Sequence, residues 1–256
     1  MEQAYNGEME AALAKAEGEL SATLKSAMTT VRNIKKAYSA AQTGNMRDFG
    51  KALDASEQSA ASLLESVGEL KTGWAFDVEN HMASGAYASE LIEAAKGQGL
   101  DIFEMDGLLY CYPFLIRTLA GELAVQIDKG RERRIRPAVL ARILKALQDK
   151  PVRFKPELFL ESLLTAYSAR GRRAGEPLAL TEIYKLLTIL PGMSRDYTLQ
   201  EFARDIYLLD QSGITLTRDG KELRLAASTG TRGSRGTLRV ITREGQERKY
   251  NTISFQ

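Results

Sequence analysis

Residues 11–45 read AALAKAEGELSATLKSAMTTVRNIKKAYSAAQTGN, and this stretch decides the fold of the N-terminal part of the chain. Apolar residues recur every seven positions in two interleaved rows, with Glu17 as the one polar exception, and this is the spacing of helices that pack along a seam. The first row contains Leu13, Leu20, Ala27 and Ile34, and the second contains Glu17, Leu24, Val31 and Tyr38. The sequence QTGN at residues 42–45 breaks the pattern, so we predict one long helix that ends there.

The same spacing resumes after this break. The first row here contains Phe49, Ser56, Leu63 and Leu70, and the second contains Leu53, Ala60, Val67 and Trp74. Two amphipathic helices with a short connection pack antiparallel, so residues 1–100 are predicted to form a helical hairpin or coiled coil, with a third helical segment near residues 77–95. The seam could pack within the chain, which is the commoner arrangement. It could also bind a second copy or a partner helix, because a lone hairpin would expose apolar surface.

Charge is sorted along the chain, so the formal net charge of +2 hides a strongly polar molecule. Residues 1–106 carry 9 Lys/Arg and 17 Asp/Glu, whereas residues 107–256 carry 26 Lys/Arg and 16 Asp/Glu. A basic half of this kind suggests contact with nucleic acid or with an acidic surface. The single cysteine excludes an intrachain disulfide and a Cys-rich zinc site. Because the sequence has no signal-peptide pattern and no apolar stretch of bilayer length, we expect a cytoplasmic protein without membrane contact.

Residues 101–155 are predicted to form a small β element followed by a basic helix. Residues 108–114 and 123–127 are typical of strands, residues 133–136 are a candidate third strand, and Pro137 suits the first position of a helix. Cations before a helix oppose its macrodipole, so helix stability does not explain the arginines there. They could be solvated, paired with the acidic hairpin or an acidic partner, or bound to phosphates. The candidate nucleic-acid-binding residues of this region are Arg131, Arg133, Arg134, Arg136, Arg142, Lys150, Arg153 and Lys155.

Residues 156–256 are predicted to form a winged-helix-like domain, because three helical patterns precede several hairpin patterns. Helices are expected at residues 156–169, 180–190 and 198–213, with Thr181 and Thr198 as N-caps and Glu201 completing a capping box. Strands are expected at residues 214–217, 223–226, 237–242 and 250–255. The predicted fold class is therefore mainly α with small β elements, an α+β protein.

The would-be recognition helix at residues 198–213 argues against base-specific binding. Its charged residues sum to −2, which suits a phosphate-lined major groove poorly. The glycine-rich residues 228–236 could instead follow a phosphate backbone, or simply form a flexible hairpin loop. The candidate nucleic-acid-binding residues in this part of the chain are Arg172, Arg173, Arg232 and Arg235.

Residues that could carry catalysis are sparse. His81 is the only histidine and Cys111 the only cysteine, and both are predicted to be packing residues because neither has an evident partner. Phosphate-loop, dinucleotide, zinc-protease and EF-hand motifs are absent, and no cofactor or metal is predicted. One weak enzymatic pattern remains, because Glu247-Arg248-Lys249 and Asp219 could hold Mg²⁺ in a nuclease.

The sequence therefore predicts a non-enzymatic accessory or interaction subunit of a bacterial complex, for which a DNA-processing or phage-defence setting is suitable. The hairpin would contact a partner protein or a second copy, and the basic half would contact DNA backbone without sequence preference. The first alternative is a self-assembling scaffold protein without nucleic-acid binding. The second is a metal-dependent nuclease.

Overall fold

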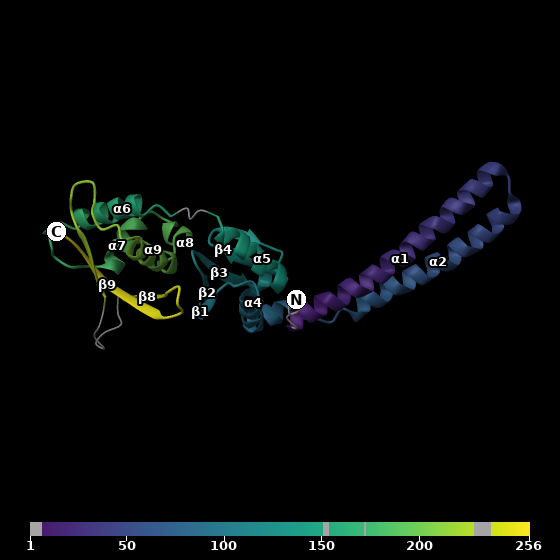
Figure 1. Ribbon diagram of the computed structural model, residues 1–256, viewed down its shortest axis with the longest axis horizontal. Helices are drawn as coiled ribbons and strands as arrows, with labels where there is room; N and C mark the ends of the chain where they lie inside the picture. The colour runs from purple at the N-terminus through teal and green to yellow at the C-terminus, as the bar shows by residue number, and fades with distance from the viewer. Residues whose placement is uncertain (1–6, 151–153, 172, 228–236) are drawn as a thin grey trace.

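The computed structural model describes residues 7–150, 154–171, 173–227 and 237–256. The chain is a mixed helix-and-sheet protein in which two long N-terminal helices precede two antiparallel sheets. Figure 1 shows these two helices extending away from the rest of the molecule. We call this pair, residues 8–73, the arm, and the described residues from Val78 onward the body. None of the helices in the described part of the chain combines the length and the apolar character that crossing a bilayer demands.

The arm consists of α1 (Glu8–Thr43) and α2 (Met46–Gly73), which lie side by side and antiparallel (Figure 1). The predicted break forms the turn between them. Gly44 ends α1 at φ 72°, a left-handed conformation that glycine adopts without strain. The side chain of Asn45 accepts a hydrogen bond from the amide of Asp48 and caps α2. At 36 residues, α1 is about 54 Å long, so the arm reaches far beyond the body.

The first half of the body is a five-stranded antiparallel sheet in which the strands follow one another in sequence order. We call it the meander sheet. Its strands are β1 (Phe103–Met105), β2 (Leu108–Cys111), β3 (Phe114–Leu119), β4 (Ala124–Ile127) and β5 (Gly130–Glu132), with the short η1 (Ala120–Glu122) between β3 and β4. Helices that precede and follow the sheet in sequence share one apolar core with it. These helices are α3 (Val78–Ala83), α4 (Ala86–Lys96) and α5 (Pro137–Gln148).

The C-terminal half contains four helices and a second antiparallel sheet. The helices are α6 (Pro156–Ala169), α7 (Leu180–Leu187), α8 (Met193–Asp196) and α9 (Leu199–Ser212), and the strands are β6 (Leu178–Ala179), β7 (Leu223–Ala227), β8 (Leu238–Ile241) and β9 (Glu247–Phe255). The long strand β9 is central, since Ile253 pairs with Leu225 of β7 on one edge and with Leu178 of β6 on the other. Strand β8 pairs with the first half of β9.

Strand β2 joins the two halves of the body. All four of its residues are buried, and alternate residues of a strand face opposite sides of the sheet. Leu109 and Cys111 belong to the core shared with α4 and α5. Leu108 and Tyr110 belong to the core of the C-terminal half. Strand β2 therefore lies between the two apolar cores and contributes side chains to both.

Several predicted helix boundaries are confirmed. Helix α6 covers the predicted residues 156–169, and Pro137 is the first residue of α5. Helix α9 begins after Thr198, and Thr198 and Glu201 form the predicted capping box. These local signals succeeded because a cap or an N-terminal proline acts through the few residues beside it.

Other predicted elements are wrong in detail. Residues 108–114 are not one strand, because β2 ends at Cys111 and β3 begins at Phe114. Residues 133–136 are not a strand, because β5 ends at Glu132 and Arg136 is the N-cap of α5. Residues 214–217 form only an isolated bridge between Leu216 and Glu222. Thr181 lies inside α7, whose N-cap is Ala179. The predicted loop at residues 228–236 lies outside the described residues.

Candidate functional site

Small side chains form the contact between α1 and α2. The buried residues of this seam are Thr30, Ala37 and Ala40 in α1 and Ala52 and Ser56 in α2. Asn33 adds a polar link, because its Nδ2 donates to the carbonyl oxygen of Ala55 at 3.2 Å and to Oγ of Ser59 at 3.4 Å. Little side-chain volume therefore separates the two helices. Ser56 belongs to a predicted row of α2, but the buried α1 residues of the seam were missed, because Ala and Thr carry a weak hydrophobic signal.

Large apolar side chains lie on the outside of the arm instead. Besides Met46 at the turn, which is 70% exposed, nine of them are between 46% and 76% exposed, namely Leu20, Leu24, Met28, Val31, Ile34 and Tyr38 of α1 and Leu53, Leu64 and Val67 of α2. The predicted row containing Leu24, Val31 and Tyr38 therefore faces solvent. Of the two arrangements that the sequence left open, packing of both α1 rows against α2 is therefore not the one observed. Only the row of Phe49, Ser56, Leu63 and Leu70 in α2 is at least partly buried throughout.

The exposed residues of both helices gather on one face of the arm. In α1, Val31 and Tyr38 directly follow the seam residues Thr30 and Ala37. In α2, Leu53 likewise directly follows the seam residue Ala52. One residue turns a helix by about 100°, so both stripes are rotated from the seam in the same sense. Because the helices are antiparallel, an equal rotation brings both stripes to the same side, which we call the apolar face.

A buried carboxylate fixes the start of the arm to the body. Glu90 of α4 accepts hydrogen bonds from the amides of Met9, at 3.1 Å, and Glu10, at 2.8 Å. A negative charge at a helix N-terminus satisfies free amides and complements the macrodipole. Glu90 is also 2.8 Å from Nε2 of His81, and both side chains are buried. A Cβ atom on Gly7 would lie 1.9 Å from Oε1 of Glu90, so only glycine fits there.

A second contact uses one of the predicted phosphate-binding arginines. Arg136 donates from Nε to Glu10 at 2.6 Å and from Nη1 to Glu17 at 2.7 Å, both on α1. These two carboxylates raise the pKa of the Arg136 guanidinium. Glu10 also accepts a hydrogen bond from the amide of Ala138 at the start of α5. Arg136 therefore joins the basic middle of the chain to its acidic arm, which is one of the interpretations left open by the sequence.

The other predicted basic residues divide into paired and unpaired groups. Arg131 lies 3.1 Å from Glu122, and Arg134 lies 2.7 Å from Glu132. Hydrogen bonds from Arg134 lower the pKa of Glu132 to about 2. Within the described ranges, the exposed cations of this set whose side chains have no ion-pair partner are Arg133, Arg142, Lys150, Lys155 and Arg173. Arg153, Arg172, Arg232 and Arg235 lie outside the described residues. The set therefore does not form one patch, because the 12 residues of α5 separate Arg133 from Lys150 by about 18 Å.

Helix α9 is packed inside the body. Eight of its residues, from Glu201 to Leu209 with the exception of Arg204, are buried. Arg204 lies 2.5 Å from Asp128 beside the meander sheet and 2.9 Å from Asp205. The helix that would read base pairs in a winged-helix domain therefore contacts the meander sheet.

The two residues that could suggest catalysis are both buried. His81 has a carboxylate partner in Glu90, which the sequence did not reveal, and its ring lies 5.1 Å from that of Phe76. Cys111 lies inside the core shared with α4 and α5, and burial raises the pKa of its thiol to about 12. At pH 8 the reactive thiolate is then on the order of one molecule in ten thousand.

We expect Cys111 to resist alkylation in the native protein for this reason. Iodoacetamide at pH 8 should leave the native chain unmodified and should label it fully in 6–8 M urea, as measured by intact mass. Native labelling at the rate of an exposed thiol would show that Cys111 is accessible.

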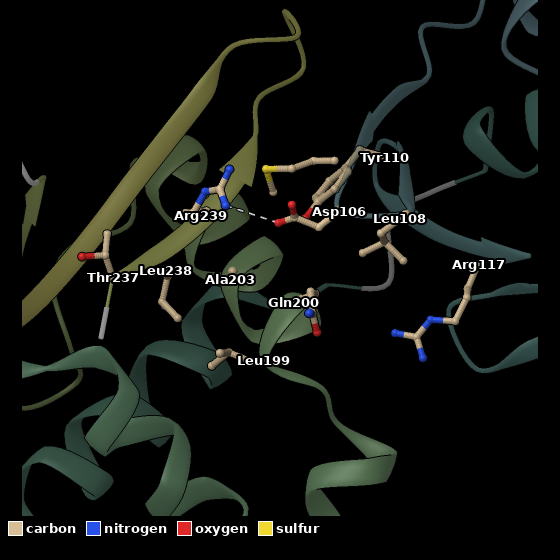
Figure 2. Close-up of a pocket in the computed structure, with 12 residues that line it drawn as sticks. Asp106, Leu108, Tyr110, Arg117, Leu199, Gln200, Ala203, Thr237, Leu238 and Arg239 are labelled. Atoms are coloured by element: carbon tan, nitrogen blue, oxygen red, sulfur yellow. Dashed lines mark hydrogen bonds and ion pairs between the residues drawn. The ribbon is translucent and has the colours of Figure 1, made fainter. Parts of the chain in front are cut away.

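A pocket of about 200 Å³ lies between the meander sheet and the C-terminal half of the body (Figure 2). Asp106 and Arg239 form an ion pair of 3.4 Å across it, and Tyr110, Arg117 and Gln200 also line it. The Tyr110 hydroxyl is buried without a hydrogen-bond partner among the described residues, and burial raises its pKa to about 12. Tyr112, two residues along, donates its hydroxyl to the carbonyl oxygen of Ile241.

We expect the substitution of phenylalanine for tyrosine to have different effects on stability at positions 110 and 112. Tyr112→Phe should lower the free energy of unfolding by about 1–2 kcal/mol, because it leaves a buried carbonyl unpaired. Tyr110→Phe should leave it unchanged within about 0.5 kcal/mol, since the Tyr110 hydroxyl makes no hydrogen bond to the described residues. Urea denaturation measures both. An equal decrease in the two variants would mean that the Tyr110 hydroxyl has a partner.

The nuclease pattern gains no support from the described geometry. The Glu247 carboxylate lies 2.5 Å from Nε of Arg239 and 3.9 Å from Nζ of Lys249. The hydrogen bond from Arg239 lowers the pKa of Glu247. Across the ranges that the structure describes, no three His, Cys, Asp or Glu side chains gather in a way that could hold a metal ion.

Comparison of the chain with protein-family models, curated proteins and solved structures finds no match.

Proposed function

We propose that this chain is a non-enzymatic interaction subunit whose arm packs its apolar face against the helices of a partner. The observation that carries the proposal is the run of nine large, roughly half-exposed apolar side chains on one face of the arm. Monomeric soluble proteins rarely leave a continuous apolar patch of this size uncovered. Helices that meet along such a stripe bury it by interdigitating side chains.

The base of the arm supports the same function. Glu90 and Arg136 hold the first turns of α1 on the body, so the arm has a fixed direction at its origin. Met9 and Leu13 of α1 pack into the core shared by α4 and α5. Beyond these turns, α1 and α2 pack against each other along their own seam. The body does not cover the apolar face, which stays exposed. A fixed, projecting pair of helices is suited to docking.

Comparative affinity purification tests this proposal. The tagged full chain, the face variant Leu24→Glu/Ile34→Glu and the control Ala22→Glu/Thr29→Glu are expressed in the native cell. Ala22 and Thr29 are exposed; Thr29 directly precedes the seam residue Thr30, and Ala22 lies one heptad earlier, so both lie on the face of α1 opposite the apolar face. Quantitative mass spectrometry should find a bound component that the control retains and the face variant does not. Identical profiles for all three forms would contradict the proposal.

We also propose that the C-terminal half is winged-helix-like, and that this half and the basic residues around α5 contact nucleic-acid backbone without reading bases. The order α6, β6, α7, α9 and then β7 with β9, and the position of β9 between β6 and β7, support the fold. Exposed cations without carboxylate partners in the described part, such as Arg133, Lys150 and Lys155, favour this mode of binding. The burial of α9 disfavours insertion into a major groove.

Duplex binding across a salt series tests this second function. Fluorescence anisotropy should show binding that weakens steeply with salt and is independent of sequence. Changing Arg133, Lys150 and Lys155 to Ala should reduce the slope of log K against log salt by about one for each phosphate that is no longer neutralised. The control, Arg131→Ala/Arg134→Ala, removes cations already paired with carboxylates and should change the slope less. Equal effects of the two sets of substitutions, or no binding by the parent chain, would exclude backbone binding through these cations.

A further inference from the structure

We infer that the apolar face of the arm binds the same face of a second copy of this chain, with the two arms antiparallel, tip against base. This inference rests on the proposed function and names the partner. The assembled arms would form a four-helix bundle in which α1 lies on α1 of the partner copy and α2 lies on its α2. Three features of the arm lead to this arrangement.

The first feature is the size of the apolar face. Nine large side chains that are each about half exposed present roughly 900 Å² of surface, close to the roughly 800 Å² that each partner gives to a standard interface. The same face on both copies is what a two-fold symmetric interface requires. Burial of this face in a bundle would remove the exposed stripe on both copies at once.

The second feature is the distribution of charge along the arm. The base half, residues 8–24 and 60–73, carries six acidic and two basic residues. The tip half, residues 25–59, carries three acidic and six basic residues. A second copy aligned tip to base therefore places opposite net charges together at both ends, whereas a parallel copy would place like charges together. Complementary potentials of this kind select orientation.

The third feature is the symmetric placement of charges beside the stripe. On α1, Glu17 and Lys35 lie nine positions on either side of residue 26. On α2, Glu57 and Lys71 lie seven positions on either side of Leu64. Residues 26 and 64 lie at nearly the same height, since both are about 19 positions from the turn. One two-fold axis at this height would therefore bring Glu17 to Lys35 and Glu57 to Lys71 of the second copy.

The members of the α2 pair are free to make these ion pairs. Glu57 and Lys71 are both exposed, and neither has an ion-pair partner among the residues that the structure describes. Each directly follows a seam position, 56 or 70, and so lies in the α2 stripe. Charges at the edge of an apolar seam set the register and orientation of helix pairs.

Sedimentation equilibrium of the full chain tests the inference. The parent chain should be a dimer at micromolar concentration. Leu24→Glu/Ile34→Glu should raise the dimer Kd by about 100-fold or more, because charges would be buried in the interface. The control Ala22→Glu/Thr29→Glu should leave Kd unchanged within a few-fold. A parent chain that stays monomeric at 100 µM, or a dimer that resists the face variant, overturns the inference.

A charge exchange on α2 tests the antiparallel alignment separately. Glu57→Lys and Lys71→Glu should each weaken the dimer several-fold, and the double variant should restore it, because the opposed charges are then exchanged. Additive weakening in the double variant overturns the antiparallel register. The parent chain could be monomeric in sedimentation equilibrium and still bind a different protein that the face variant does not bind. This result would overturn self-association but leave the proposed function standing. If neither property depends on the face, both fail.

Discussion

Replacing Glu90 with alanine is expected to lower the free energy of unfolding by about 3–5 kcal/mol. The substitution removes the acceptor of the Met9 and Glu10 amides at the start of α1. It also leaves buried His81 without the carboxylate that lies 2.8 Å from its Nε2. Loss of a helix N-cap alone costs about 1 kcal/mol, and an unpaired buried polar group adds to it.

Glu93→Ala is the matched control for this prediction. Glu93 lies one turn away on α4 but is exposed and pairs only with Lys96 among the described residues. Its removal should change the free energy of unfolding by less than about 0.5 kcal/mol. Urea denaturation gives both values, and hydrogen exchange should show the first turn of α1 opening in the Glu90 variant alone. Similar decreases in both variants would contradict the anchor.

Glutamate at two neighbouring positions of α1 should have very different effects on the arm. Ala37→Glu puts a charge into the buried seam with α2 and should destabilise the arm by about 2–4 kcal/mol. Ile34→Glu, one turn earlier, lies on the apolar face and should change the stability of the isolated monomer by less than about 0.5 kcal/mol. The difference follows from burial alone, since both substitutions add the same charge to the same helix.

Hydrogen exchange of α1 and α2 amides, at a dilution where the chain is monomeric, measures both effects. Ala37→Glu should speed exchange along both helices, because each is held by the other. Ile34→Glu should leave the exchange of both helices at the parent rate. The reverse pattern would show that the heptad rows of α1, and not the small residues, form the seam.

Local sequence signals predicted the elements well. The QTGN break, Pro137 and the Thr198–Glu201 capping box each act through adjacent residues, so each could be placed without knowledge of the rest of the fold. Residues 133–136 and 214–217 were wrong as strands because strand formation depends on a partner strand, which a local pattern does not contain.

The packing partner of a stripe could not be predicted from its periodicity. Rows with Leu24 and Val31 have the spacing of a seam, yet α2 packs against the neighbouring face of Thr30, Ala37 and Ala40. Periodicity shows that a face is apolar and does not show what covers it. A run of like charges likewise does not show what its members bind. Arg136 belongs to a basic run, yet it forms ion pairs with Glu10 and Glu17 of the acidic arm.

The most direct test of whether the apolar face is an interaction surface is hydroxyl-radical footprinting of the full chain in its assembled and dissociated forms. Assembly should lower the labelling of Leu24, Ile34 and Tyr38 several-fold. Ile189 and Leu216, which are apolar residues of the body that are more than 60% exposed, should be labelled at the same rate in both forms. Unchanged labelling of Leu24, Ile34 and Tyr38 on assembly would contradict the role of the arm proposed above.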